Sequence, residues 1–329
     1  MPQSGLDLNY YIRAFQQLHI SRSRGAAPHK PILLLAVLDE IENGSITENR
    51  IFITPELVSR FKEIWSVLVD STVFVPSFAL PFYHLDGKGN RHADHFWHLS
   101  TFPGCEIAVT SSNSIRSFAA LKSSVEYAYF DATLFDYLIQ PNYRDILRNT
   151  LLDKHFENTK SRYLNGRIIQ GNYINGVEHK MLNEEPLQYK KEIQNADEEE
   201  IFVRNGVFKK LIPRIYKYTC CISGFRVEST TGIQMIDACH IVPFSESYDD
   251  TITNGISLCP NLHRAFDRGL ISLDDHYKVL VSEIFLESDS DYSIRRFENK
   301  EIKLPENQKY LPSKEGLAKH RAKWISNFK

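Results

Sequence analysis

The segment 236–269 constrains this chain most, because it spaces reactive side chains as a small strand-and-helix unit would. His240 closes a short apolar stretch, Asn254 follows fourteen residues later, and His263 follows nine residues after that. Residues 260–268 have the apolar spacing of a short helix. The pattern therefore predicts a histidine at a strand end, an asparagine in a loop and a histidine near the start of a helix.

These residue types suit the hydrolysis of a phosphodiester, which needs a base to deprotonate water and a cation to neutralise charge on the leaving oxygen. His240 can be the base, because an imidazole has an ordinary pKa of about 6.5. His263 and Asp267 lie four residues apart on one face of the expected helix, so both can bind one divalent ion. Asn254 can fix either His240 or the loop by amide hydrogen bonds.

Asp237 or Cys239 is expected to supply a further ligand from the strand. Because side chains alternate along a strand, these two lie on one face, opposite His240 if the strand stays regular. The residues themselves leave the choice between the two open.

The flanking sequences DACHIVP and NGISLCPNLHRAFDRG resemble the HNH, or ββα-metal, nuclease family over residues 201–329. The resemblance implies a catalytic set and a metal-binding set that share a residue: His240, Asn254 and His263 for catalysis, and His263, Asp267, Asp237 and Cys239 for the metal. The implied cofactor is a divalent metal, Mg²⁺ or Mn²⁺, with Zn²⁺, Co²⁺ or Ni²⁺ as alternatives. Many members hold a structural zinc with paired CxxC motifs, but residues 221–224 contain one cysteine, so a four-cysteine zinc is not expected.

Composition excludes a disordered chain, a collagen-like fibre and a disulfide-dense miniature protein, since 42% of residues are hydrophobic and 24% charged. The five cysteines form no CxxC pair, which predicts a reduced, cytoplasmic protein in which Cys220, Cys221 and Cys259 are buried as small apolar side chains. No signal peptide and no membrane span are expected. The net charge is −2, so any DNA binding must use local clusters of cations.

The periodicity predicts an α+β chain with a domain at 1–155, a linker at 156–200 and a second domain at 201–329. The first domain is expected to be mainly helical with a short β-hairpin, whose strands are residues 82–85 and 96–99. The linker range is polar, contains Asn-Gly twice and ends in acidic residues 197–200. A helix over 202–218 is expected to open the second domain.

Cations gather where a loop enters the buried helix that begins near residue 31. Arg24, His29 and Lys30 lie there, and phosphates favour helix N-termini. The segments APHKPILLL, VPSFALPFYHL and HFWHL resemble the sulfur-binding domain of phosphorothioate-dependent, McrA-like type IV restriction endonucleases, in which this domain precedes an HNH domain. The resemblance covers most of residues 8–155. It implies that His29 and Lys30 are the basic pair of a sulfur pocket, with Pro76 and Ala79 in the pocket wall, or Pro81 and His84 in their place.

Together these resemblances imply a modification-dependent restriction endonuclease that binds phosphorothioated double-stranded DNA and cuts nearby with a divalent metal. Cutting both strands with one site per chain predicts a homodimer. An HNH nuclease that reads another mark, such as 5-methylcytosine, is an alternative, because base readers use aromatic cages and this domain contains Phe78, Phe82, Tyr83, Phe96 and Trp97. A DNA-binding protein with an inert HNH fold is the third interpretation.

Overall fold

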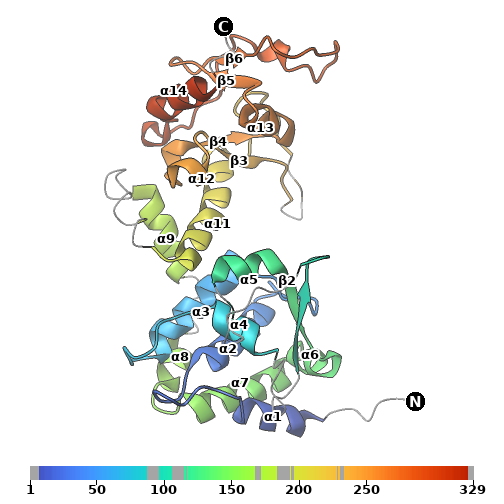
Figure 1. Cartoon of the computed structure of the whole chain (residues 1–329), viewed down its shortest axis with the longest axis vertical. Helices are drawn as coiled ribbons and strands as arrows, with labels where there is room; N and C mark the ends of the chain where they lie inside the picture. The colour runs from blue at the N-terminus through green and yellow to red at the C-terminus, as the bar shows by residue number, and fades with distance from the viewer. Residues whose placement is uncertain are drawn as a thin grey trace, which may run out of the picture. The chain divides into compact units, whose positions relative to one another are not determined.

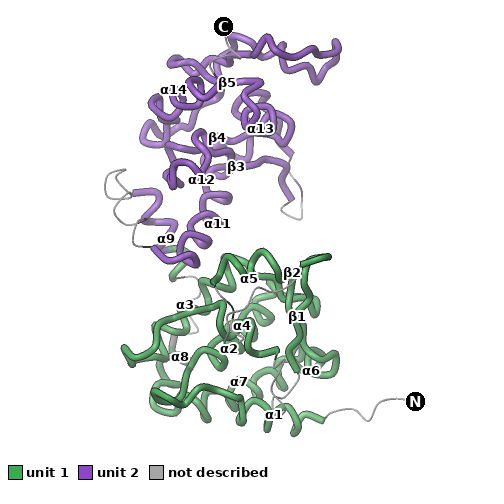
Figure 2. Tube along the Cα trace, viewed as in Figure 1, with its two compact units in different colours: residues 1–175 green, residues 176–329 purple. Residues whose placement is uncertain are grey.

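The computed structural model describes residues 7–86, 96–105, 115, 117–166, 172–183, 193, 196–227, 229 and 233–324. The chain divides into two compact units, residues 1–175 and 176–329 (Figure 2). Helices predominate, and the described strands pair two by two into small antiparallel sheets, as an α+β architecture requires (Figure 1).

The first unit is a helical domain that contains one two-stranded sheet among the described residues. Its elements are α1 (Leu8–Gln16), α2 (His29–Glu42), α3 (Pro55–Leu68), α4 (Ala79–His84), β1 (Trp97–Thr101), α5 (Phe118–Ser124), β2 (Val125–Phe130), α6 (Ala132–Leu138), α7 (Pro141–His155) and α8 (Lys160–Gly166). Residues 31–41 of α2 are all buried, because α3, α4 and α7 pack around this helix. Thr54 caps α3 by accepting a hydrogen bond from the backbone N–H of Leu57 at 3.2 Å.

The predicted hairpin of residues 82–85 and 96–99 is wrong in its first strand. Residues 79–84 form helix α4, in which Phe82 lies four residues after Phe78 and packs on it with ring centroids 5.3 Å apart. The true partner of β1 is β2, with Trp97 opposite Phe130. A run of aromatic residues is typical of a strand, but packing against residues distant in the sequence makes this segment helical. Residues 87–95, which include the expected turn, lie outside the described residues.

The range 156–200, expected as a linker, is partly helical. α8 packs against α3, and the side chain of Tyr163 is 3% exposed. Helix α9 (Asn172–Asn183) crosses the point where the two units divide. The acidic residues 197–200 begin a helix, because Asp197 and Glu200 form a reciprocal capping box. Among the described residues of this range, the buried Tyr163 and the capping box at 197–200 accompany helices that no hydrophobic period indicates.

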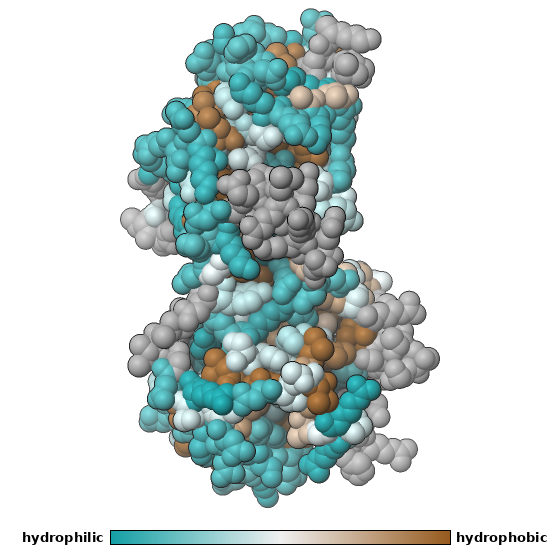
Figure 3. Space-filling view, turned by 90° about the vertical axis from the view of Figure 1, so that its left-hand side faces the viewer, coloured by the Kyte–Doolittle hydropathy of each residue, from teal (hydrophilic) through white to brown (hydrophobic). Residues whose placement is uncertain are grey.

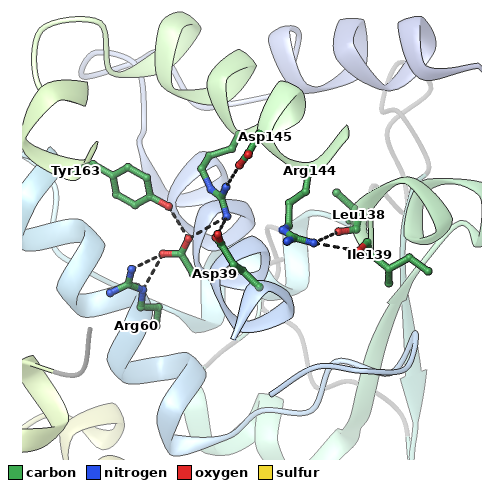
Figure 4. Close-up of polar contacts among 9 residues, drawn as sticks. Asp39, Arg60, Leu138, Ile139, Arg144, Asp145 and Tyr163 are labelled. Atoms are coloured by element: carbon green, nitrogen blue, oxygen red, sulfur yellow. Dashed lines mark hydrogen bonds and ion pairs between the residues drawn. The ribbon is translucent and has the colours of Figure 1, made fainter. Parts of the chain in front are cut away.

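A buried ionic cluster ties the helices of the first unit together (Figure 4). The carboxylate of Asp39 is 1% exposed and accepts hydrogen bonds from Arg60 at 2.5 and 2.8 Å and from the hydroxyl of Tyr163 at 2.6 Å. Arg148 lies 3.5 Å from the same carboxylate and also pairs with Glu42. The cluster thus joins α2, α3, α7 and α8.

After the end of α9, the described part of the second unit continues with a long helix, two short strand–helix segments, a second two-stranded sheet and a final helix. Its elements are α11 (Glu198–Ile215), β3 (Asp237–His240), α12 (Phe244–Ser247), the 3₁₀ helix η1 (Ile252–Asn254), β4 (Gly255–Leu258), α13 (Pro260–Asp267), β5 (Ile271–Leu273), β6 (Val279–Val281), η2 (Arg295–Phe297), η3 (Gln308–Tyr310) and α14 (Lys314–Lys323). β3 and β4 pair antiparallel, with His240 opposite Gly255.

Gly255 allows α11 to lie directly on this hairpin. A Cβ at Gly255 would lie 2.4 Å from Cδ1 of Ile212 and 2.8 Å from Cζ of Phe208. The absence of a side chain therefore lets Phe208 reach the strand that carries His240.

None of the described helices is long and apolar enough to cross a membrane. On the face drawn in Figure 3, the apolar residues of each unit form small patches between hydrophilic ones.

Candidate functional site

Three metal-ligating side chains converge between β3 and α13. Cys239, His263 and Asp267 each offer one ligand atom, and these atoms all lie within 4.8 Å of one another. Nε2 of His263 is 3.4 Å from Oδ2 of Asp267, and Sγ of Cys239 is 3.9 Å from Oδ1 of the same carboxylate. The thiol is buried and the carboxylate exposed. A sulfur, a nitrogen and an oxygen donor on one open side form a set that fits a divalent transition metal.

Asp237 contacts this trio through the ring of His263. Its Oδ2 is 3.1 Å from Nδ1 of His263, so the carboxylate accepts a hydrogen bond from the ring nitrogen that faces away from Asp267. Of the two strand residues expected as ligands, the structure places Cys239 among the converging atoms. Asp237 instead contacts the ring of His263, in the arrangement by which a carboxylate can orient a histidine that binds a metal.

His240 ends β3 and packs flat on Phe208, with ring centroids 4.0 Å apart and an angle of 5° between the planes. Burial is the largest cause that lowers the pKa of His240 to about 4, and the positive charge of Lys209 acts in the same direction. The imidazole is therefore neutral at physiological pH and can accept a proton. Its Nε2 is buried and has no hydrogen-bond partner in the described part of the chain.

Asn254 fixes the loop that follows His240. Its Oδ1 accepts a hydrogen bond from the N–H of Val242 at 2.9 Å, and its Nδ2 donates to the carbonyls of Val242 at 3.0 Å and Asp249 at 2.8 Å. Of the two roles expected for this amide, these contacts favour holding the loop. Asn254 is thus a positioning residue for the strand end.

A cavity of about 340 Å³ opens beside the metal-ligating trio. His240 and Asp267 line it, and α14 contributes Lys319, Lys323 and the adjoining Trp324 to its lining. Nζ of Lys323 lies 2.6 Å from a carboxylate oxygen of Glu246, and Nζ of Lys319 lies 2.7 Å from one of Glu315. The sequence reasoning missed these residues, although two lysines and a tryptophan within six positions were the available signal.

In the first unit, His29 pins the start of α2 to a loop. Its Nε2 donates to the carbonyl of Val75, 2.9 Å away, and its ring packs 4.7 Å from that of Trp65 and 6.0 Å from that of Phe74. Burial lowers the pKa of this imidazole. A Cβ at Gly25 would lie 3.9 Å from the ring of Phe74, so the loop that carries Arg24 approaches the same place.

Lys30, the next residue, lies close to His84 of α4. The charge of Lys30 and burial together lower the pKa of His84, with burial the larger cause. Burial alone lowers the pKa of Lys30 to about 8, and this ammonium has no ion pair or hydrogen bond with the residues that the structure describes. The helix start and α4 thus hold a poorly solvated cation beside a histidine.

The remaining expected pocket residues differ in their exposure. Pro76 is partly exposed, whereas Ala79 and Pro81 are buried. Exposed apolar side chains surround them in sequence: Val75 is 73% and Leu80 38% exposed. Partial exposure of both Pro76 and His84 leaves the two alternative placements of the pocket wall open.

The aromatic residues considered for a base-reading cage serve the core instead. Phe78, Phe82, Phe96 and Trp97 are at most 1% exposed, and the indole N–H of Trp97 donates to the carbonyl of Phe82 at 3.0 Å. Tyr83 is the partly exposed member of the group. A cage that holds a flipped base needs accessible ring faces, which these four buried rings do not offer.

Residues 220–274 match the family described as HNH endonuclease. This part of the chain is an HNH endonuclease domain. The match includes the converging Cys239, His263 and Asp267 together with His240 and Asn254. The HNH domain confirms the expectation of a metal-dependent endonuclease for this part of the chain.

One similar solved structure is that of a protein described as "Modification dependent TagI restriction endonuclease". The identity is 22% and the TM-score 0.27, over 35% of this chain and 36% of that one. This chain therefore matches about a third of that structure, a likeness too limited to assign a substrate. A comparison with curated proteins gave no match.

Proposed function

We propose that the chain is a modification-dependent endonuclease. Its first unit binds phosphorothioated double-stranded DNA, and its HNH domain hydrolyses a phosphodiester bond nearby with a divalent metal. The observation that supports this most directly is the convergence of Cys239, His263 and Asp267 beside His240 within an HNH endonuclease domain.

In this proposal His240 takes the proton from the attacking water, since its imidazole is neutral and the residue lines the cavity beside the trio. Phe208 and Asn254 hold the ring and the strand end in place. A metal bound by the trio would supply the positive charge that neutralises the leaving oxygen. The positive charge of Lys209, which acts on His240, is available to an incoming phosphate.

The donor set bears on which metal is used. A thiolate such as that of Cys239 is a poor ligand for Mg²⁺ and a good one for Zn²⁺, Co²⁺ or Ni²⁺. The structure thus favours the second group over the Mg²⁺ or Mn²⁺ that the family resemblance implies. Burial raises the pKa of this thiol, so metal binding would release a proton and strengthen as the pH rises.

The environment of Lys30 supports a reader of modified phosphate in the first unit. A cation that burial has partly stripped of water gains much from an anion placed beside it. Sulfur is larger and less hydrated than oxygen, so apolar neighbours such as Val75 and Leu80 would favour a phosphorothioate over a phosphate. His84 beside Lys30 adds a second hydrogen-bonding group.

A gel-shift experiment tests the reader. The full-length protein is titrated into one duplex made with and without a single phosphorothioate, in each stereochemistry and at fixed salt, because phosphate contacts depend on salt. We expect tighter binding to one sulfur stereoisomer and loss of that preference in Lys30→Ala. Lys154→Ala, an exposed lysine of α7, is the matched control. Equal binding to all duplexes would reject the sulfur reader and leave the nuclease proposal intact.

His240→Ala tests the division of labour. We expect this variant to bind modified DNA with unchanged affinity and to cleave none of it. Loss of binding in this variant would mean that the HNH domain itself does the reading. Two HNH domains can cut both strands in one binding event, so we also propose a homodimer, which sedimentation of the protein with and without DNA would test.

A further inference from the structure

Two of the cysteines converge on one serine, away from the metal-ligating trio. Cys220 lies in the turn after α11, where Gly224 (φ 72°) donates its N–H to the carbonyl of Cys220 at 2.9 Å. Cys259 is the residue that caps the start of α13. The N–H of Ser223 donates to Sγ of Cys220 at 3.4 Å, and its Oγ lies 4.0 Å from Sγ of Cys259.

The two thiols also contact each other. The Cys259 thiol donates a hydrogen bond to the sulfur of Cys220, and this bond, together with those from Ser223, lowers the pKa of Cys220 to about 5. The same bond, with burial, raises the pKa of Cys259, so the proton that remains in the pair lies between the two sulfurs on the Cys259 side. Such a pair loses its first proton readily, because one sulfur stabilises the negative charge on the other. Thiolates, and not thiols, attack disulfides.

The other cysteines lack this arrangement. Burial raises the pKa values of the Cys221 and Cys239 thiols well above the ordinary one. Cys105 is exposed and belongs to the first unit. Cys259 is partly exposed and Cys220 fully buried, so a reagent from solution reaches the pair at Cys259.

We propose that Cys220 and Cys259 are a dithiol site that forms a disulfide by exchange with a small-molecule disulfide such as oxidised glutathione. The proton of Cys259 passes to the Cys220 thiolate along the hydrogen bond between them, and the partly exposed Cys259 thiolate attacks the small disulfide, forming a mixed disulfide and releasing one small thiolate. That thiolate takes the proton of Cys220. The Cys220 sulfur then attacks the mixed disulfide at Cys259 and releases the second small thiolate. This thiolate takes up a proton from water, which balances the proton that the pair lost when it ionised. Two protein thiols are oxidised, and one small disulfide is reduced to two thiols.

The bond would fasten the start of the helix that carries the candidate metal ligands. Cys259 accepts a hydrogen bond through its carbonyl from the N–H of His263 at 2.9 Å. The turn at Cys220 is already joined to β4, since the N–H of Cys221 donates to the carbonyl of Ser257 at 2.8 Å. A disulfide here closes a loop that contains β3, β4 and His240, and it should raise the unfolding temperature of the HNH domain.

The test uses the full-length protein with Cys105→Ser, which removes the exposed thiol and leaves four cysteines. The protein is incubated with oxidised glutathione and a chelator, its thiols are counted, and its peptides are mapped without reduction. We expect two thiols to disappear, a peptide pair joined through 220 and 259, and a higher unfolding temperature that a reductant reverses.

Adding Cys221→Ser should leave this result unchanged, whereas adding Cys259→Ser should leave all remaining thiols reduced. If Cys259→Ser does not fold, Cys220→Ser gives the second readout: glutathione should then stay on Cys259. A bond between Cys220 and Cys221, persistent glutathione on Cys259 with Cys220 present, or four unreacted thiols would each overturn the proposal. None of these outcomes depends on DNA binding or cleavage.

Discussion

Asp237 holds His263 through Nδ1, 3.1 Å from its carboxylate, while the other ring nitrogen lies 3.4 Å from Asp267. This contact keeps the proton on Nδ1 and leaves the Nε2 lone pair for a metal. Asp237→Ala should therefore weaken binding of Zn²⁺ or Co²⁺ by about 10- to 100-fold, and Asp267→Ala by more. Calorimetric titration of metal measures both. Asp289→Ala, on an exposed loop, is the control, and unchanged affinity in Asp237→Ala would contradict the orienting role.

The flat stack of Phe208 on His240 predicts a loss of rate without a loss of metal. Phe208→Leu keeps an apolar side chain but removes the ring that fixes the imidazole, and a shift of about 1 Å in a catalytic group can cost about 100-fold. We expect DNA cleavage to slow by about 10- to 100-fold, with metal affinity unchanged. Phe15→Leu makes the same change in the core of the first unit and should leave the cleavage rate unaltered. Equal rates in the two variants would argue against the stack as a positioning contact.

Gly269 follows α13 with φ +64°, and a Cβ there would lie 2.3 Å from the ring of Trp324. Gly269→Ala must therefore displace the tryptophan that lines the cavity, in addition to straining the backbone at a cost of about 1–3 kcal/mol. Gly44→Ala has the same kind of φ, +76°, but open space around the Cβ. We expect a clearly larger fall in unfolding temperature for Gly269→Ala, and similar falls would mean that Trp324 moves aside without cost.

His320 should make the second unit sensitive to acid. Its Nε2 donates to the carbonyl of Phe266 at 3.0 Å, its Nδ1 accepts from Ser272 at 2.8 Å, and burial lowers its pKa to about 4. His320 binds a proton near pH 6.5 in the unfolded chain but only near pH 4 in the folded chain. The stability that the neutral ring contributes is therefore complete above pH 6.5 and is lost as the pH falls from 6.5 to 4. The loss amounts to roughly 3 kcal/mol.

Urea unfolding between pH 7.5 and 4 measures this effect. His320→Gln should make the pH dependence shallower, because glutamine does not titrate, while His240, whose pKa is also about 4, still contributes. His276→Gln, at an exposed histidine, should leave it in place. A pH profile that is identical in wild type and His320→Gln would show that other groups govern acid sensitivity.

The Asp39 cluster should dominate the stability of the first unit. Asp39→Ala leaves the buried guanidinium of Arg60 and the hydroxyl of Tyr163 without this carboxylate, and breaking a buried pair costs about 3–5 kcal/mol. Thermal unfolding followed by circular dichroism would show the change. Asp136→Ala removes an exposed carboxylate of α6 and should have little effect. A loss as small as that of the control would mean that Glu63, which also pairs with Arg60, compensates.

The parts of the site that sequence could predict are those built by neighbours in the chain. His263 and Asp267 share a helix face because they are four residues apart, and Cys239 lies opposite His240 because a strand alternates. Phe208 and Lys319 come from helices more than thirty residues away on either side. The spacing within 236–269 therefore does not show that Phe208 packs on His240 or that Lys319 lines the same cavity. The catalytic and metal-binding roles that we assign to residues of 236–269 stay predictions.

The fold shows the same limit. Helices α2 and α13 lie where periodicity and proline at the start predict them. The pairing of β1 with β2 depends on packing between distant segments, and the aromatic run at 82–85 became helical for the same reason. Within residues 160–165 of α8, Tyr163 is the one buried side chain, and one buried residue gives no hydrophobic periodicity.

The lining of the cavity beside His240 comes from separate parts of the chain: His240 and Asp267 come from β3 and α13, and Lys319 and Lys323 come from α14. Substitutions in α14 can therefore change the charge and shape of this cavity while the candidate hydrolytic side chains stay the same. These two parts of the lining can thus vary independently in evolution.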